Sequence, residues 1–151
     1  MIDLRTILLA EDNPYDVELT MKALAEHNLA NRVVNVNDGV EVLDYLTYEG
    51  EYKTRKKGNP AVILLDIKMP RMDGIEVLKT IRSHPDFKML PIVILSSSRE
   101  EFDLKRCYEL GANAYVVKPV DFKDFFEVIK QLGIFWAVIN ELPTEGGEQN
   151  G

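Results

Sequence analysis

Three acidic side chains follow short apolar runs in this sequence, and they are the first residues that could do chemistry. Glu11 and Asp12 come directly after the run Thr6–Ala10, and Asp66 comes directly after the run Ala61–Leu65. If both runs are strands of a parallel sheet, their carboxyl ends lie at one edge, where such folds bind ligands. Two unit charges ~4 Å apart repel by about 4 kcal/mol at an effective dielectric constant near 20, so this cluster needs a positive partner. Carboxylate oxygens without histidine or cysteine favour Mg²⁺ over zinc.

A serine and a lysine end two further apolar runs. Ser96 follows Ile92–Leu95, and Lys118 follows Ala114–Val117. Each of these polar residues, taken alone, fits an ordinary turn, cap or solvated strand end. Their coincidence at one predicted sheet edge favours a shared site, in which Lys118 compensates part of the negative charge.

The runs that position these side chains alternate with helical patterns. This order predicts an α/β fold built on a parallel sheet with right-handed crossovers. Three runs are apolar nearly throughout, as strands covered by helices on both faces must be. The predicted strands are Thr6–Ala10, Arg32–Val36, Ala61–Leu65, Ile92–Leu95 and Ala114–Val117. Capping patterns predict helix starts at Asn13, Asp38, Asp73, Ser98 and Asp121, and Gly111 is expected just past the end of the fourth helix.

Length and charge limit the classes of protein that fit. The 151 residues suit one domain, which we place at residues 1–143, followed by a flexible tail at 144–151. The formal net charge of −7 disfavours direct binding to the phosphate backbone of nucleic acids. One cysteine and two histidines suffice for neither a disulfide nor a zinc site. Because no apolar run reaches ~18 residues and no signal-peptide pattern occurs, we expect a cytoplasmic protein without membrane contacts.

Several motifs occur in an order and spacing that resembles the receiver domain of two-component response regulators. They are Glu11-Asp12, Asp66-Ile67-Lys68-Met69-Pro70, Asp73-Gly74, Ser96 and Lys118-Pro119, within residues 6–132. The resemblance implies a doubly wound, flavodoxin-like fold of three layers, with five parallel strands in the order 2-1-3-4-5 and five helices. It also implies a signalling protein rather than an enzyme.

The resemblance assigns roles to the acidic residues. It implies that Asp66 is the phosphoacceptor. It also implies that Glu11, Asp12 and Asp66, with the main-chain carbonyl of Lys68, bind Mg²⁺ as the cofactor.

Further roles follow from the same resemblance. Ser96 corresponds to the hydroxyl residue that closes on the phosphoryl group, Lys118 to its ion-pairing lysine, and Tyr115 to the aromatic switch residue. Lys68 and Ser98 correspond to positions that flank the path of the water that attacks the phosphoryl group. Neither is an acid or an amide able to orient that water well, so we expect slow autodephosphorylation.

The loop before Ala61 and the C-terminal segment from Phe135 to Pro143 are similar to those of the small response regulators that serve cyanobacterial phytochromes. The resemblance therefore implies a sensor histidine kinase, a phytochrome in that subfamily, as the phosphodonor. We also predict a homodimer formed through the C-terminal helix face, because apolar residues occur all round that helix. One stripe, expected to cover the sheet, contains Phe122, Phe125, Ile129, Leu132 and Trp136; the surplus contains Phe126, Ile134, Phe135, Val138 and Ile139.

Two other functions compete with this interpretation. A phosphatase or phosphotransferase of the haloacid-dehalogenase type also uses an aspartyl nucleophile, but it needs a second aspartate two residues later, where this chain has Lys68. A flavin-binding module of the same fold needs a phosphate-cradling loop after the first strand, where Glu11 and Asp12 would repel a phosphate.

Overall fold

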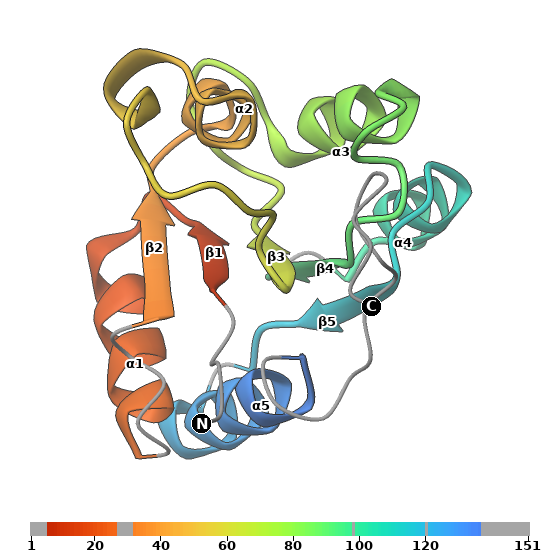
Figure 1. The fold of residues 1–151 in the computed structure, drawn as a ribbon. Coiled ribbons are helices and arrows are strands. Elements are labelled where there is room, and N and C mark those ends of the chain that lie inside the picture. The colour runs from red at the N-terminus through yellow and green to blue at the C-terminus, as the bar shows by residue number, and fades with distance from the viewer. Residues whose placement is uncertain (1–5, 27–31, 98, 120, 137–151) are drawn as a thin grey trace, which may run out of the picture.

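The computed structural model describes residues 6–26, 32–97, 99–119 and 121–136. Within them, five parallel strands form one sheet in the order β2-β1-β3-β4-β5 (Figure 1). The strands are β1 (Ile7–Ala10), β2 (Val33–Val36), β3 (Val62–Leu65), β4 (Ile92–Ser96) and β5 (Ala114–Val117). The five predicted strands are confirmed to within one residue at each end, and so is the implied strand order.

Helices cover both faces of the sheet, which gives the predicted three layers. They are α1 (Pro14–Ala25), α2 (Gly39–Thr47), the short 3₁₀ helix η2 (Gly50–Tyr52), α3 (Gly74–Ser83), α4 (Glu101–Glu109) and α5 (Phe122–Ile134). In Figure 1, α1 and α5 lie on one side of the strands, and α2, α3 and α4 lie on the other. No helix in the described ranges is long and apolar enough to cross a membrane.

The core divides into two apolar clusters, one on each face of the sheet. Alternate residues of β1 supply both: Leu8 packs into the cluster under α2, α3 and α4, whereas Ile7 and Leu9 pack into the cluster under α1 and α5. This alternation follows from the two-residue period of a strand. It explains why β1, β3 and β4 are buried at every position, as their unbroken apolar sequences predict.

Most of the predicted helix starts are confirmed by capping hydrogen bonds. Asn13, Asp38 and Asp73 each accept a hydrogen bond from the backbone amide three residues further on, at 2.9–3.2 Å. The cap predicted at Ser98, which lies outside the described residues, is wrong. Helix α4 begins only at Glu101, because the backbone is still extended at Glu100, and no side-chain hydrogen bond caps it there.

The apolar stripe predicted for α5 is confirmed at four of its five residues. Phe122 is the exception, with a side chain that is 51% exposed. It lies in the first turn of α5, directly after the loop that leaves the carboxyl end of β5, before the helix has reached the core. Phe126, predicted to be surplus surface, packs against the core instead. Val138, Ile139 and the predicted tail lie outside the described residues.

Candidate phosphoacceptor site

The three predicted carboxylates meet at the carboxyl edge of the sheet. Glu11 follows β1 and its amide donates to the carbonyl of Val36 at 3.0 Å, while the amide of Asp66, which follows β3, donates to the carbonyl of Ala10 at 3.1 Å. Oxygens of Glu11, Asp12 and Asp66 lie within 4.8 Å of one another. Glu11 and Asp66 are largely buried, whereas Asp12 is exposed. The sheet thus fixes two of the acids, and the third faces solvent.

Lys118 places its ammonium group among these carboxylates. Its Nζ atom lies 2.5 Å from Glu11 Oε1, 2.9 Å from Asp16 Oδ2 and 3.6 Å from Asp66 Oδ2. The backbone of Lys118 is fixed as well, because its amide donates to the carbonyl of Ser96 at 2.7 Å. The predicted compensation of negative charge by Lys118 is therefore seen in the contacts themselves.

Asp16 is the member of this network that the strand-end pattern did not identify. It belongs to the first turn of α1, not to the end of a strand, and its side chain is 20% exposed. The signal that could have found it is an acid three residues after the Asn13 cap. An acidic residue stabilises the first turn of a helix, and α1 begins at the sheet edge where β1 ends.

Burial and charge shift two pKa values in the cluster. Burial raises the pKa of Glu11 to about 7, with the charge of Asp66 adding to the shift and the hydrogen bond from Lys118 opposing it. Burial alone would lower the pKa of Lys118, but hydrogen bonds to Glu11 and Asp16 and the charge of Asp66 outweigh it and raise that pKa. Lys118 is therefore a permanent cation at neutral pH.

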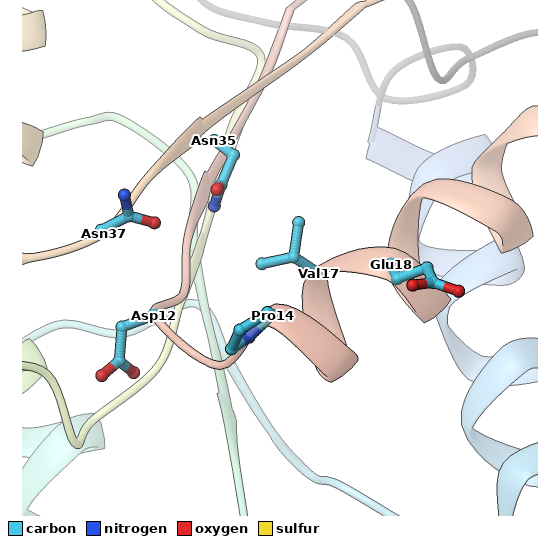
Figure 2. Close-up of a pocket in the computed structure, with 6 residues that line it drawn as sticks. All are labelled: Asp12, Pro14, Val17, Glu18, Asn35 and Asn37. Atoms are coloured by element: carbon cyan, nitrogen blue, oxygen red, sulfur yellow. The ribbon is translucent and has the colours of Figure 1, made fainter.

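The donor set of this cluster fits a hard divalent cation. Three carboxylates offer oxygen ligands, and the exposure of Asp12 leaves room for the water ligands that Mg²⁺ retains. Asp12 also lines an open pocket of about 380 Å³, together with Pro14, Val17, Glu18, Asn35 and Asn37. Figure 2 shows Asp12 at one end of this pocket and Glu18 at the other, with Val17 between them. Asp12 is therefore open to solvent on this side.

The loop from β3 to α3 turns tightly beside Asp66. The amide of Gly74 donates to the carbonyl of Ile67 at 2.8 Å. A Cβ atom at position 74 would lie only 2.3 Å from the carbonyl oxygen of Asp66, so the turn requires glycine here. Lys68 lies in this loop with its side chain exposed. Its proposed carbonyl ligand and its effect on phosphoryl lifetime stay predictions.

The predicted switch residues lie on β4 and β5. Ser96 ends β4 and is 1% exposed. Tyr115 is partly buried against the core under α4, and its amide donates to the hydroxyl of Tyr108, from α4, at 3.2 Å. Ser98 lies outside the described residues. The roles of these residues in switching stay predictions.

The fold and the clustered acids define a class of protein. The family model for the response regulator receiver domain matches residues 7–130, and the chain belongs to that family. A receiver is a signalling domain, so the haloacid-dehalogenase alternative is not favoured.

Individual relatives show which response regulators this chain is similar to. The chain is 34% identical over 140 residues to response regulator Rcp1 of Synechocystis sp. (strain ATCC 27184 / PCC 6803 / Kazusa), covering 93% of this chain and 94% of the relative. A crystal structure described as the phosphorylated cyanobacterial phytochrome response regulator RcpA is 39% identical with a TM-score of 0.86, covering 94% of this chain and all of that one. The bacteriophytochrome response regulator AtBRR is 56% identical with a TM-score of 0.73, covering 93% and 100%.

Proposed function

We propose that this receiver accepts a phosphoryl group on Asp66 from a histidine kinase in a Mg²⁺-dependent reaction. The observation that carries the proposal is the clustering of Glu11, Asp12 and Asp66 within 4.8 Å, with the ammonium of Lys118 among them. The phosphorylated state described for RcpA supports it.

The proposed transfer exchanges one bond to phosphorus for another. A carboxylate oxygen of Asp66 forms an O–P bond, the P–N bond of a phosphohistidine breaks, and the imidazole keeps the electron pair and takes up a proton from solvent. Glu11, Asp12, Asp66 and the main-chain carbonyl of Lys68 would hold Mg²⁺. When bound, the ion supplies positive charge that neutralises phosphoryl oxygens. Lys118 adds a point charge from the protein itself.

Signal output is proposed to begin at Ser96. A phosphoryl group at Asp66 offers new acceptor oxygens, and the Ser96 hydroxyl moves to donate to one of them. The space that it leaves admits Tyr115, which turns inward. Such a two-position element lets a local change of charge alter the surface formed by α4, β5 and α5.

The phosphodonor is proposed to be a phytochrome kinase. RcpA is described as a phytochrome response regulator and AtBRR as a bacteriophytochrome response regulator, and this chain matches them over 93% or more of its length. A match at 56% identity over 93% of this chain supports a shared type of partner better than the receiver fold alone does.

A homodimer through the C-terminal helix face is the last part of the proposal. Phe135 is 45% exposed, although its neighbour Trp136 packs against the core. The two rings lie 5.0 Å apart in an edge-to-face arrangement, which supports the Phe135 ring at the surface. Within the described residues, Ile134 and Phe135 form the C-terminal helix face. Exposed aromatic surface of this kind is typical of an interaction site.

Incubation with Mg²⁺ and acetyl phosphate, followed by intact-mass measurement, tests the acceptor. We expect one acid-labile phosphoryl adduct in the wild type and none in Asp66→Asn. Asp12→Ala should raise the Mg²⁺ concentration needed for half-maximal labelling, because it removes one proposed ligand while leaving Asp66 in place. Equal labelling of Asp66→Asn and wild type would contradict the proposal.

A further inference from the structure

The carboxylate of Asp16 lies closer to the ammonium of Lys118 than Asp66 does. The two distances are 2.9 Å from Lys118 Nζ to Asp16 Oδ2 and 3.6 Å to Asp66 Oδ2. The Lys118 side chain is 10% exposed, so water screens these charges only weakly. The charge on Asp16 therefore affects where the lysine ammonium lies within the site.

The backbone that carries Asp16 is held firmly. Its amide donates to the Asn13 side chain at 3.2 Å, and its carbonyl accepts from the hydroxyl of Thr20 at 2.7 Å. Thr20 is buried, and Pro14 fixes the first helical position of α1. Because α1 fixes the backbone of Asp16 in this way, its carboxylate can follow Lys118 toward Asp66 only by rotation of its short side chain.

A phosphoryl group on Asp66 would attract the same ammonium. It carries about −1.5 to −2 charges near neutral pH, more than a single carboxylate does. If Lys118 moves to it, Asp16 loses a charge-assisted hydrogen bond in a largely buried place, which is unfavourable. The two anionic groups therefore compete for one lysine.

We propose that Asp16 is a positioning residue that holds Lys118 on the α1 side of the site and so weakens its attraction to a phosphoryl group on Asp66. The inference rests on the proposed function, because it takes Asp66 as the acceptor. In this arrangement α1 biases the receiver toward its unphosphorylated state. Removing the Asp16 charge leaves Glu11, 2.5 Å from Lys118 Nζ, as the other carboxylate that holds the lysine. The hold on the α1 side is then weaker, and a phosphoryl group at Asp66 binds more favourably.

Beryllofluoride, an analogue of the phosphoryl group, probes this competition directly. Titrated into the full chain at fixed Mg²⁺ and followed by NMR of backbone amides, it should bind Asp16→Asn about tenfold more tightly than wild type. That factor is the size expected for one charge-assisted hydrogen bond. Asp16→Glu keeps the charge and should stay within about twofold of wild type, on the same scale.

Glu18→Gln is the matched control variant. It removes the same charge from the same helix, but Glu18 pairs with Lys22 at 3.0 Å, and both of these side chains are exposed. We expect its affinity for beryllofluoride to equal that of wild type. A general effect of helix charge would instead change both variants alike.

The NMR signal of the Lys118 ammonium group provides a second measurement. Without beryllofluoride, it should shift in Asp16→Asn and remain in place in Glu18→Gln, which a purely structural role of Asp16 would not produce. Asp16→Ala replaces Asp16→Asn if the latter folds poorly, since alanine has the highest helix propensity.

The outcomes separate the inference from the proposed function. Failure of wild type to bind beryllofluoride at all would contradict the acceptor site itself. Binding by wild type with equal or weaker affinity in Asp16→Asn, relative to Glu18→Gln, would overturn the role of Asp16 alone.

Discussion

Single residues at the sheet edge show which features of the site can be predicted from sequence. Glu11, Asp12, Asp66 and Lys118 lie just past the ends of β1, β3 and β5, so the geometry of a parallel sheet is enough to predict that they meet. This reasoning did not identify Asp16, because Asp16 lies on a helix and not at the end of a strand. Its approach to Lys118 depends on how α1 packs beside the end of β5, which local sequence does not specify.

Lys68 is proposed to lengthen the lifetime of the phosphoryl group. It lies two residues past Asp66 with an exposed side chain, and it has no oxygen with which to orient an attacking water. Lys68→Asn supplies an amide at that position, so dephosphorylation should become several-fold faster. The decay of the adduct, followed by intact mass after removal of phosphodonor, measures this. Lys88→Asn, an exposed lysine in the loop after α3, is the control. Equal decay rates of the adduct in wild type and Lys68→Asn would contradict a role of position 68 in the phosphoryl lifetime.

At the level of elements, helix α2 is tied to the loop that carries the proposed acceptor. Arg71 donates from Nε and Nη2 to the two carboxylate oxygens of Asp38, at 2.8 and 3.1 Å. The amide of Gly39 donates to the carbonyl of Met72 at 3.1 Å, and a Cβ atom at position 39 would lie 2.2 Å from that oxygen. The backbone of Arg71 has a φ of 63°, an uncommon conformation for a residue other than glycine. The cap of α2 thereby also anchors the loop between Asp66 and α3.

The Asp38 carboxylate should make stability depend on acid pH. Burial alone would raise its pKa, but hydrogen bonds from Arg71 and from the amide of Glu41 lower it below the ordinary 3.8. A carboxyl group with a lowered pKa in the folded state stabilises the protein above pH 3.8, and this contribution is lost as the pH falls through the lowered pKa. Urea unfolding between pH 7 and pH 2 measures it.

Asp38→Asn should therefore be less stable than wild type at pH 7, and its free energy of unfolding should approach that of wild type as the pH falls toward 2. Asp38→Ala also loses the cap of α2 and should cost about 1 kcal/mol more. Asp73→Asn is the control variant, because Asp73 caps α3 with the same geometry as Asp38 caps α2. A stability difference between wild type and Asp38→Asn that stays constant with pH would contradict the ion-pair contribution.

The loop after α2 shows what a local pattern misses at this scale. Its basic composition is typical of a solvated loop, yet Arg55 lies between the rings of Tyr45 and Tyr48, with its guanidinium carbon 3.9 and 4.1 Å from their centroids. Its Nε also donates to the carbonyl of Tyr45 at 2.7 Å. These partners are seven and ten residues away, so only the folded loop brings them together.

At the scale of the whole molecule, the prediction of a dimer rests on the exposed apolar side chains of α5. The sequence predicted a helix with more apolar residues than the sheet can cover. Phe126 packs against the core, so the surplus within the described residues is smaller than expected. Phe122 and Phe135 remain half-exposed at the two ends of the helix. Helical spacing alone could not assign Phe122 and Phe126 correctly, because it does not reveal where the helix meets the core.

Phe135→Glu should convert the proposed dimer into a monomer. A charge in the centre of an apolar interface loses its hydration without gaining a partner, which opposes association strongly. Light scattering coupled to size exclusion, with and without beryllofluoride, measures the mass of the particle. Met89→Glu changes another exposed apolar side chain, which is in the loop after α3, and should leave the dimer intact. A wild-type monomer in both conditions would contradict the dimer.

Chemical mapping of the phosphorylated residue tests the central claim most directly. Borohydride reduces an aspartyl phosphate to homoserine, which marks the acceptor in a peptide sequence by mass spectrometry. After incubation with acetyl phosphate, we predict homoserine at position 66 when Mg²⁺ is present and none when the ion is chelated. Homoserine at Asp12 or Asp16 instead, or at no position, would contradict the assignment of Asp66 as the acceptor.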